Sequence, residues 1–152
     1  MSEVVPGVSK IEDGLYQGAL SCVVKHWDEI KDLFDWIVLC ATEVEKLPRG
    51  ERHILYCPID DNDQGISEDA FRLLWLNVAS GNGRLLTICH MGENRSGLAS
   101  AMALIMRGHN VEDAITTVRR EGNKISPGVP HSFWNEGFAR QLREKFGPTK
   151  LP

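Results

Sequence analysis

Short apolar runs alternate along the chain with segments in which apolar residues recur at helical spacing. The runs Trp36–Cys40, Ile54–Cys57 and Leu85–Ile88 are continuous, as in strands that are buried on both faces. Helical spacing occurs in residues 22–34, 67–80, 95–106, 111–121 and 132–146. Strands that alternate with helices predict an α/β fold, in which a central, mostly parallel sheet is flanked by helices.

Turn and capping residues set the expected limits of these segments. Asp13 and Gly14 form a turn dipeptide and predict a hairpin between residues 10–11 and 15–18. Residues typical of helix starts and helix ends are Ser21, Ser67, Asn110, Gly81 and Gly122. The last helix is expected to begin at Ser132 and to close at the Gly147-Pro148 pair.

The length of the chain fits one domain. Its 152 residues are enough to bury a full-sized core. We expect a flexible arm over residues 1–8, a domain over residues 9–147 and a tail over residues 148–152. The break at residues 48–50, Pro-Arg-Gly, is expected to separate two elements of this domain.

Composition and charge exclude several classes of protein. The net charge of −4 offers no general basic field for nucleic acid or an anionic membrane. No apolar run reaches transmembrane length. The first residues lack the features of a signal peptide, and four cysteines without metal-type spacing are expected to stay thiols. These observations predict a cytoplasmic protein that needs no metal and no cofactor.

The most informative stretch surrounds one of these cysteines. The apolar run that begins at Leu85 leads into Cys89, and a short loop with Gly92 at its centre then leads to Arg95. Backbone N–H groups of such a loop, together with the N-terminus of the following helix, can bind an anion. An arginine supplies two parallel donors for phosphate oxygens, and positive surroundings favour the thiolate. The pattern therefore predicts a loop that both binds a phosphoryl group and attacks it.

Each residue of this loop receives an expected role. Cys89 is the nucleophile that forms a phosphocysteine, and Arg95 clamps the phosphoryl oxygens. Ser96 is expected to hydrogen-bond the Cys89 sulfur and help it to leave, although the sequence also allows a plain helix cap. The residues expected to surround the phosphate are His90, Met91, Gly92, Glu93, Asn94 and Arg95.

The loop resembles the Cys-x5-Arg signature of the protein tyrosine phosphatase superfamily, and the chain is similar to its small atypical dual-specificity branch. The similarity covers residues 8–146 and includes segments 11–18, 36–41, 56–61 and 135–142. The resemblance implies hydrolysis of phosphotyrosine, phosphoserine or phosphothreonine in a protein or peptide partner, without metal. It also implies that an aspartate upstream of the cysteine protonates the leaving oxygen.

Three aspartates of one acidic loop (residues 60–65) are candidates for that role. The family's spacing from Pro58 favours Asp61, whereas counting from Tyr56 favours Asp63. Asp60 is the third candidate. At least two of the three must be ordinary solvated carboxylates.

The chain departs from the family pattern at Ile88, where a histidine is usual. Glu93 is a second informative position, because a carboxylate facing the substrate would repel a second phosphate and so disfavour phosphoinositides. Cys40 resembles the resolving cysteine of some family members, with Cys57 as the alternative, and simple packing is the competing explanation.

Three other functions remain open. The first is a phosphatase of a phospholipid, a nucleotide or an RNA 5′ end, since residues 94–97 resemble the RNA triphosphatase branch. The second is a pseudophosphatase binding module. The third is sulfur transfer of the rhodanese kind, which the upstream aspartates and the Arg-Ser-Gly helix entry disfavour.

Overall fold

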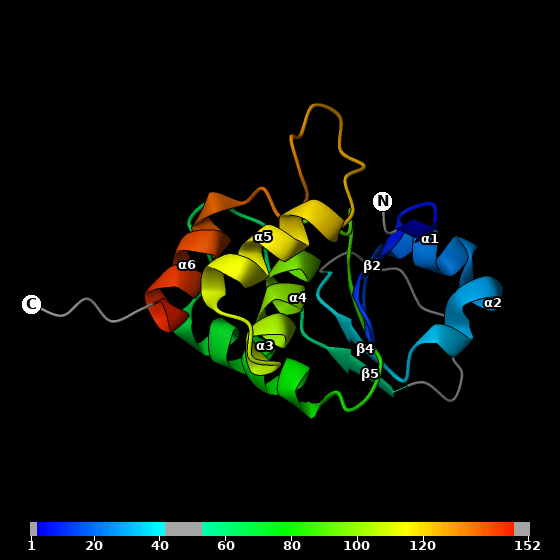
Figure 1. Cartoon of the computed structure of the whole chain (residues 1–152), viewed down its shortest axis with the longest axis horizontal. Coiled ribbons are helices and arrows are strands. Elements are labelled where there is room, and N and C mark those ends of the chain that lie inside the picture. The colour runs from blue at the N-terminus through cyan, green and yellow to red at the C-terminus, as the bar shows by residue number, and fades with distance from the viewer. Residues whose placement is uncertain (1–2, 42–52, 148–152) are drawn as a thin grey trace, which may run out of the picture.

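A computed structural model describes residues 3–41 and 53–147 of the chain (Figure 1). The strands are β1 (Glu3–Val5), β2 (Val8–Glu12), β3 (Leu15–Ala19), β4 (Trp36–Leu39), β5 (His53–Tyr56) and β6 (Leu85–Cys89). The helices are α1 (Leu20–Lys25), α2 (Trp27–Ile30), the 3-10 turn η1 (Lys31–Leu33), α3 (Glu68–Ser80), α4 (Arg95–Met106), α5 (Val111–Glu121) and α6 (Glu136–Phe146). The expected break at residues 48–50 and the expected tail at 148–152 lie outside the described residues.

The strands form one six-stranded sheet in the order β1-β2-β3-β6-β4-β5. The pairs β3·β6, β6·β4 and β4·β5 are parallel, and β1·β2 and β2·β3 are antiparallel. This arrangement confirms the predicted α/β fold with a mostly parallel central sheet. Because three parallel pairs meet at its centre, the carboxyl ends of β3, β6, β4 and β5 lie along one edge of the sheet.

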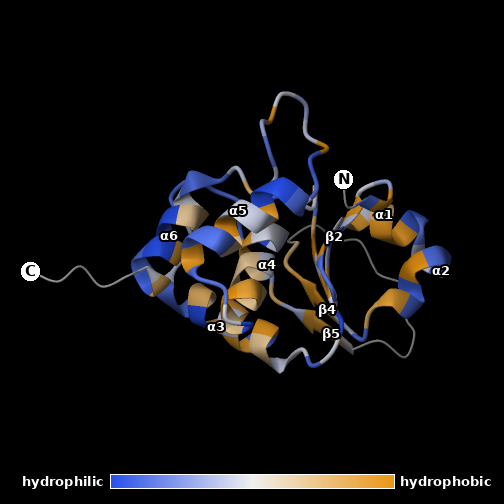
Figure 2. Ribbon diagram, viewed as in Figure 1, coloured by the Kyte–Doolittle hydropathy of each residue, from blue (hydrophilic) through white to orange (hydrophobic). Residues whose placement is uncertain are grey.

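Helices cover both faces of this sheet (Figure 2). One core cluster lies toward α3–α6, and the other toward α1 and α2. The residues of β6 divide between them with period two: Leu85 and Cys89 join the first cluster, whereas Leu86 and Ile88 join the second. Cys89 therefore faces α4, and the isoleucine that stands in place of the expected histidine packs in the opposite core.

Three expected boundaries are wrong. Residues 3–5 and 8 lie in strands and not in a flexible arm, because the chain folds back and pairs Glu3 with Ser9. Ser21 does not cap the first helix, which already begins at Leu20 and is followed by two further short helical turns. The last helix begins at Glu136 and not at Ser132, because the Asn135 side chain accepts a bond from the Phe138 N–H and caps it there.

The other boundaries agree with the sequence. Ser67 and Asn110 accept bonds from backbone N–H groups of the first turns of α3 and α5. Gly81 and Gly122 follow the last residues of these helices. Within the part of the chain that the structure covers, no helix has the length and apolar character needed to cross a bilayer.

Candidate active site

The cysteine loop (residues 89–95) joins the central strand β6 to helix α4. Cys89 is the last residue of β6, and Arg95 is the first residue of α4. β6 lies between β3 and β4, so that the loop emerges at the middle of the sheet edge. Ligands bind at this edge in open α/β sheets, and the helix N-terminus adds N–H donors and partial positive charge there.

The Cys89 thiol is enclosed and has one hydroxyl partner. Its side chain is 2% exposed, and its Sγ donates a hydrogen bond to Ser96 Oγ over 3.2 Å. Ser96 is fully buried in the first turn of α4, where Asn94 occupies the cap position. The structure thus brings Ser96 to the sulfur and excludes a helix-cap role for it. His90, next in the chain, is exposed.

Gly92 is the residue at which the loop passes close to the backbone of β3. Its φ is +69°, and a Cβ there would lie 2.5 Å from both the Ala19 nitrogen and the Gly18 carbonyl carbon. Its carbonyl accepts a bond from the Gln17 side-chain amide over 2.8 Å. In a trans peptide the following N–H, that of Glu93, points the opposite way, away from β3. Gln17 therefore orients one N–H donor of the loop, a role the sequence did not reveal.

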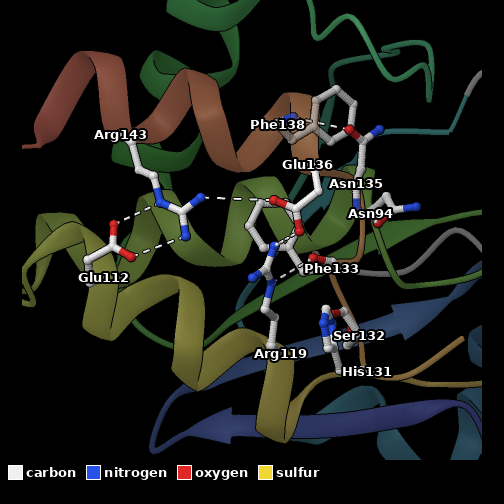
Figure 3. A network of polar contacts seen from close by, with 10 residues as sticks. All are labelled: Asn94, Glu112, Arg119, His131, Ser132, Phe133, Asn135, Glu136, Phe138 and Arg143. Carbon is white, nitrogen blue, oxygen red and sulfur yellow. Dashed lines mark hydrogen bonds and ion pairs between the residues drawn. The ribbon is translucent and has the colours of Figure 1, made fainter.

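Asp61 is the acidic residue that the fold fastens to the cysteine loop. Its Oδ2 accepts a bond from the Asn94 amide over 3.2 Å, and its Oδ1 accepts one from the Asn135 amide over 2.8 Å. Asn94 belongs to the loop, and Asn135 is the cap of α6. The Asn135 backbone N–H also donates to Asn94 Oδ1 over 2.9 Å, which closes the group of three (Figure 3 shows Asn94 beside Asn135).

The competing aspartates have no such attachment. Asp63 is exposed, and its carboxylate accepts a bond from the adjacent Gln64 over 3.3 Å. Neither Asp63 nor Asp60 hydrogen-bonds the cysteine loop within the described part of the chain.

Arg95 is almost enclosed despite its charge. It is 7% exposed, and its Nη1 donates to the carbonyl of Ile59 over 3.2 Å. Ile59 lies just before the acidic loop. The guanidinium therefore links the start of α4 to the chain that carries Asp61.

Glu93 is placed differently from the expectation. Its side chain is 1% exposed, and its carboxylate accepts bonds from Ser126, Ile125 and Trp134. The carboxylate is therefore occupied by the chain itself and does not face the substrate as the sequence analysis expected. The polar partners lie more than thirty positions away in sequence, so no local pattern could have shown them.

Three cysteines stand side by side at the carboxyl ends of neighbouring strands. Leu39 pairs with Ile88, and the Cys40 N–H continues the ladder by donating to the Ile88 carbonyl over 2.7 Å. Cys40, directly after β4, therefore lies beside Cys89 at the end of the adjacent β6, and both join the same core cluster; adjacent strands lie about 4.8 Å apart. Cys57 directly follows β5, the next strand beyond β4, and its N–H donates to the Leu39 carbonyl. Burial, reinforced by the neighbouring Cys89, raises the pKa of Cys40 well above its ordinary value.

The connection from α5 to α6 is held by ion pairs and by an unusual phenylalanine. Arg119 binds Glu136 and the Phe133 carbonyl, and Arg143 bridges Glu136 and Glu112 (Figure 3). Phe133 is fully buried with φ +49°, and a Cβ at Gly97 would lie 2.9 Å from its Cδ1.

Side chains of the last helix and of the residues before it support the loops of the site. The Gln141 side-chain amide bonds both the N–H and the carbonyl of Ile66, at the end of the acidic loop. Trp134 contacts the cysteine loop through Glu93, whereas the neighbouring Phe133 belongs to the core. Within residues 3–41 and 53–147, no three histidine, cysteine or acidic side chains are grouped so that they could hold a metal ion.

Comparisons with known proteins agree with this architecture. No family model and no curated protein matches the chain. Among solved structures, human DUSP28 superposes with a TM-score of 0.73 at 19% identity, over 95% of each chain. OH1 from the Orf virus, "a tyrosine phosphatase that displays distinct structural features and triple substrate specificity", gives 0.65 at 16% identity, over 95% of this chain and 90% of that one. A complex of P. aeruginosa TpbA with pTyr gives 0.59 at 18% identity, over 78% and 76%.

The chain therefore has the fold of the protein tyrosine phosphatases, in the form found in the small dual-specificity phosphatases. At these identities the likeness establishes the fold, and the chemistry must be argued from the residues of the site.

Proposed function

We propose that the protein is a cysteine-dependent phosphomonoester hydrolase that acts on phosphotyrosine, phosphoserine or phosphothreonine in proteins. The observation that carries the proposal is the attachment of Asp61, through Asn94, to the same loop that begins with Cys89 and its bond to Ser96. A nucleophile, its hydroxyl partner and a proton donor are then held by one short loop. The fold shared with known phosphatases supports the same reading.

The first step transfers the phosphoryl group to sulfur. The Cys89 thiolate attacks phosphorus, the bond from phosphorus to the ester oxygen breaks, and Asp61 gives its proton to the departing oxygen. Arg95 and the loop N–H groups bind the remaining phosphoryl oxygens. Asn94 and Asn135 each donate to one oxygen of the Asp61 carboxyl group, which fixes that group beside the cysteine loop.

The second step releases phosphate. Water attacks phosphorus, Asp61 takes the proton of that water, and the phosphorus–sulfur bond breaks to regenerate the thiolate. The Ser96 hydroxyl is already at 3.2 Å from the sulfur and stabilises it as it leaves. Asp61 thus acts as an acid and then as a base, and the cycle needs no metal.

The test is turnover of an aryl phosphate by the wild type and by Cys89→Ser, followed by a panel of phosphotyrosine, phosphothreonine, phosphoinositide and RNA 5′-triphosphate substrates. Cys89→Ser is expected to abolish turnover and to keep binding of an oxyanion such as tungstate, because the N–H donors and Arg95 remain. Substantial turnover by this variant would remove Cys89 as nucleophile. Preference for the lipid or RNA substrate would replace the protein-directed proposal.

A matched pair of variants tests the acid. Asp61→Asn is expected to slow alkyl phosphates by about a hundredfold or more and nitrophenyl phosphate far less, because nitrophenolate leaves without protonation. Asp63→Asn is the control and is expected to match the wild type. The reverse result would assign the acid to Asp63.

A further inference from the structure

The α5–α6 segment (residues 122–135) is the chain that runs from the end of α5 to the start of α6. In Figure 1 it rises beyond the helices at the top of the view before it returns to α6. Although its middle projects in this way, both of its ends are anchored in the core. Asn123 is buried and binds Ser9 and the Gly7 carbonyl, and Ser132 is buried beside Gln17.

This segment is attached to three consecutive residues of the cysteine loop. Gln17 donates both to the Gly92 carbonyl and to Ser132 Oγ, over 2.8 and 3.1 Å. Asn94 accepts from the Asn135 N–H over 2.9 Å. Between these two attachments lies Glu93, whose side chain binds residues near both ends of the segment.

Glu93 makes the largest number of these contacts. Its Oε2 accepts from the Ile125 and Ser126 N–H groups over 2.6 and 2.8 Å. Its Oε1 accepts from Ser126 Oγ over 2.6 Å and from Trp134 Nε1 over 3.2 Å. A buried carboxylate is costly unless hydrogen bonds compensate it, and here four donors do so, all of them supplied by the α5–α6 segment.

The attached segment presents a distinctive surface next to the cysteine loop. Ile125 and Trp134, which flank the Glu93 contacts, are each 40% exposed. Lys124 is exposed and makes no hydrogen bond or ion pair with any residue in the described ranges. Trp134 directly precedes Asn135, whose side chain bonds Asp61, and the Trp134 indole itself bonds Glu93. The indole therefore lies close to both carboxyl groups in the chain of contacts.

We propose that Glu93 is a positioning residue that fixes the α5–α6 segment as a preorganised wall of the substrate cleft, and that this wall binds the residues flanking a phosphotyrosine. The two apolar side chains suit an aromatic phosphoester and its neighbours, and Lys124 suits an acidic residue beside it. A wall fixed before binding lowers the entropic cost of ordering the complex. This inference rests on the proposed phosphatase function.

Limited proteolysis tests the attachment without any need for activity. Trypsin cleaves the peptide bond between Lys124 and Ile125, and Glu93 accepts a hydrogen bond from the N–H of Ile125. In Glu93→Ala, cleavage of the Lys124–Ile125 bond is expected to accelerate by about tenfold or more, because local opening of the segment no longer breaks four hydrogen bonds. Glu93→Gln, which keeps one acceptor oxygen, is expected to fall between Ala and wild type. Val111→Ala, a buried change at the start of α5, is the stability control and is expected to leave this cleavage near the wild-type rate.

Kinetics test the role of the wall in recognition. The ratio of kcat/KM for an acidic phosphotyrosine peptide to kcat/KM for nitrophenyl phosphate is expected to fall by about tenfold in Glu93→Ala, chiefly through the KM of the peptide. Trp134→Phe, which loses one hydrogen bond and keeps an aromatic ring, is expected to change the ratio less. Val111→Ala should leave the ratio as in the wild type.

The outcomes separate the two proposals. Unchanged cleavage at Lys124 in Glu93→Ala would overturn the attachment, and an unchanged ratio with faster cleavage would overturn the wall. If the wild type hydrolysed neither substrate, the phosphatase proposal and the recognition role would both fail, while the cleavage rates would still decide whether Glu93 holds the segment.

Discussion

Asn135 joins the stability of the last helix to the position of the proposed acid, and the two contributions can be separated by substitution. Its Oδ1 caps α6 by accepting from the Phe138 N–H, and its Nδ2 donates to Asp61 Oδ1 and to the Asn62 carbonyl over 2.8 and 2.7 Å. Serine caps a helix as well as asparagine does, but its side chain is too short to reach Asp61. Asn135→Ser therefore removes the donors and keeps the cap, whereas Asn135→Ala removes both.

The magnitudes follow from these contacts. Water can replace the lost donors at the exposed Asp61 and Asn62, so each bond is counted at about 1 kcal/mol, and Asn135→Ser is expected to lower the free energy of unfolding by about 2 kcal/mol. The missing cap adds about 1 kcal/mol, which brings Asn135→Ala to about 3 kcal/mol. In urea denaturation these losses move the midpoint by about 1 to 1.5 M for a slope near 2 kcal/mol/M.

The expected loss of activity in Asn135→Ser depends on the leaving group of the substrate. Losing one of its two amide anchors costs Asp61 part of its positioning, so Asn135→Ser is expected to slow an alkyl phosphate by about tenfold and nitrophenyl phosphate by less than about threefold. Equal slowing of both substrates would show that Asn135 does not act through the acid. Equal unfolding free energies for the serine and alanine variants would show that the cap contributes nothing.

Four further predictions concern the loop and its thiols. Arg95→Lys is expected to lose about a hundredfold or more in kcat/KM, because a point charge cannot replace two parallel donors; near-normal efficiency would argue against the clamp. Gly92→Ala is expected to be inactive, since its Cβ would strike the backbone of β3, whereas Gly108→Ala, at φ +102° in open space, should remain active; an active Gly92→Ala would contradict the tight approach. Peroxide is expected to oxidise Cys89 to a sulfenic acid, which Cys40 attacks to form a disulfide with loss of water, so that a dithiol restores the wild type but not Cys40→Ser; equal recovery would leave Cys40 as packing only. Because burial raises the pKa of Cys40 in the folded state, its contribution to stability is complete below about pH 8.5 and is lost as the pH rises. The urea midpoint of the wild type is therefore expected to fall with rising pH in the alkaline range, and that of Cys40→Ala to fall less. An equal fall in both proteins would refute this assignment.

The sequence predicted the parts of the fold that depend on local patterns. The continuous apolar run before Cys89 gave the central strand, and the caps at Ser67 and Asn110 gave helix starts to within one residue. The full order of the six strands in the sheet followed only once the register was known. Local periodicity does not encode which strands pair, because that choice is made by the packing of both faces.

The sequence offered candidates for the reacting residues of the site, and it offered none for the residues that hold them in place. The pattern around Cys89 pointed to that residue, and the family's spacing from Pro58 favoured Asp61 with Asp63 left open. The partners of Glu93 lie in another segment, more than thirty positions away. The predicted start of the last helix was wrong for a similar reason. Phe133 adopts a left-handed conformation and enters the core, and the residues around it are all compatible with a helix, so the sequence gives no sign of this. Such features are set by tertiary contacts that override local preference.

The bonds around Gly92 also determine when, during folding, the cysteine loop can reach its final shape. The loop depends on Gln17, which lies 75 positions earlier in the chain, and the hydroxyl of Ser9 meets Asn123 across 114 positions. Contacts that close such long loops form late in folding. During refolding from denaturant, helical circular dichroism should therefore recover before phosphate binding does. A chain released from the ribosome before residue 123 would carry the cysteine loop without the segment that binds Glu93 and Asn94.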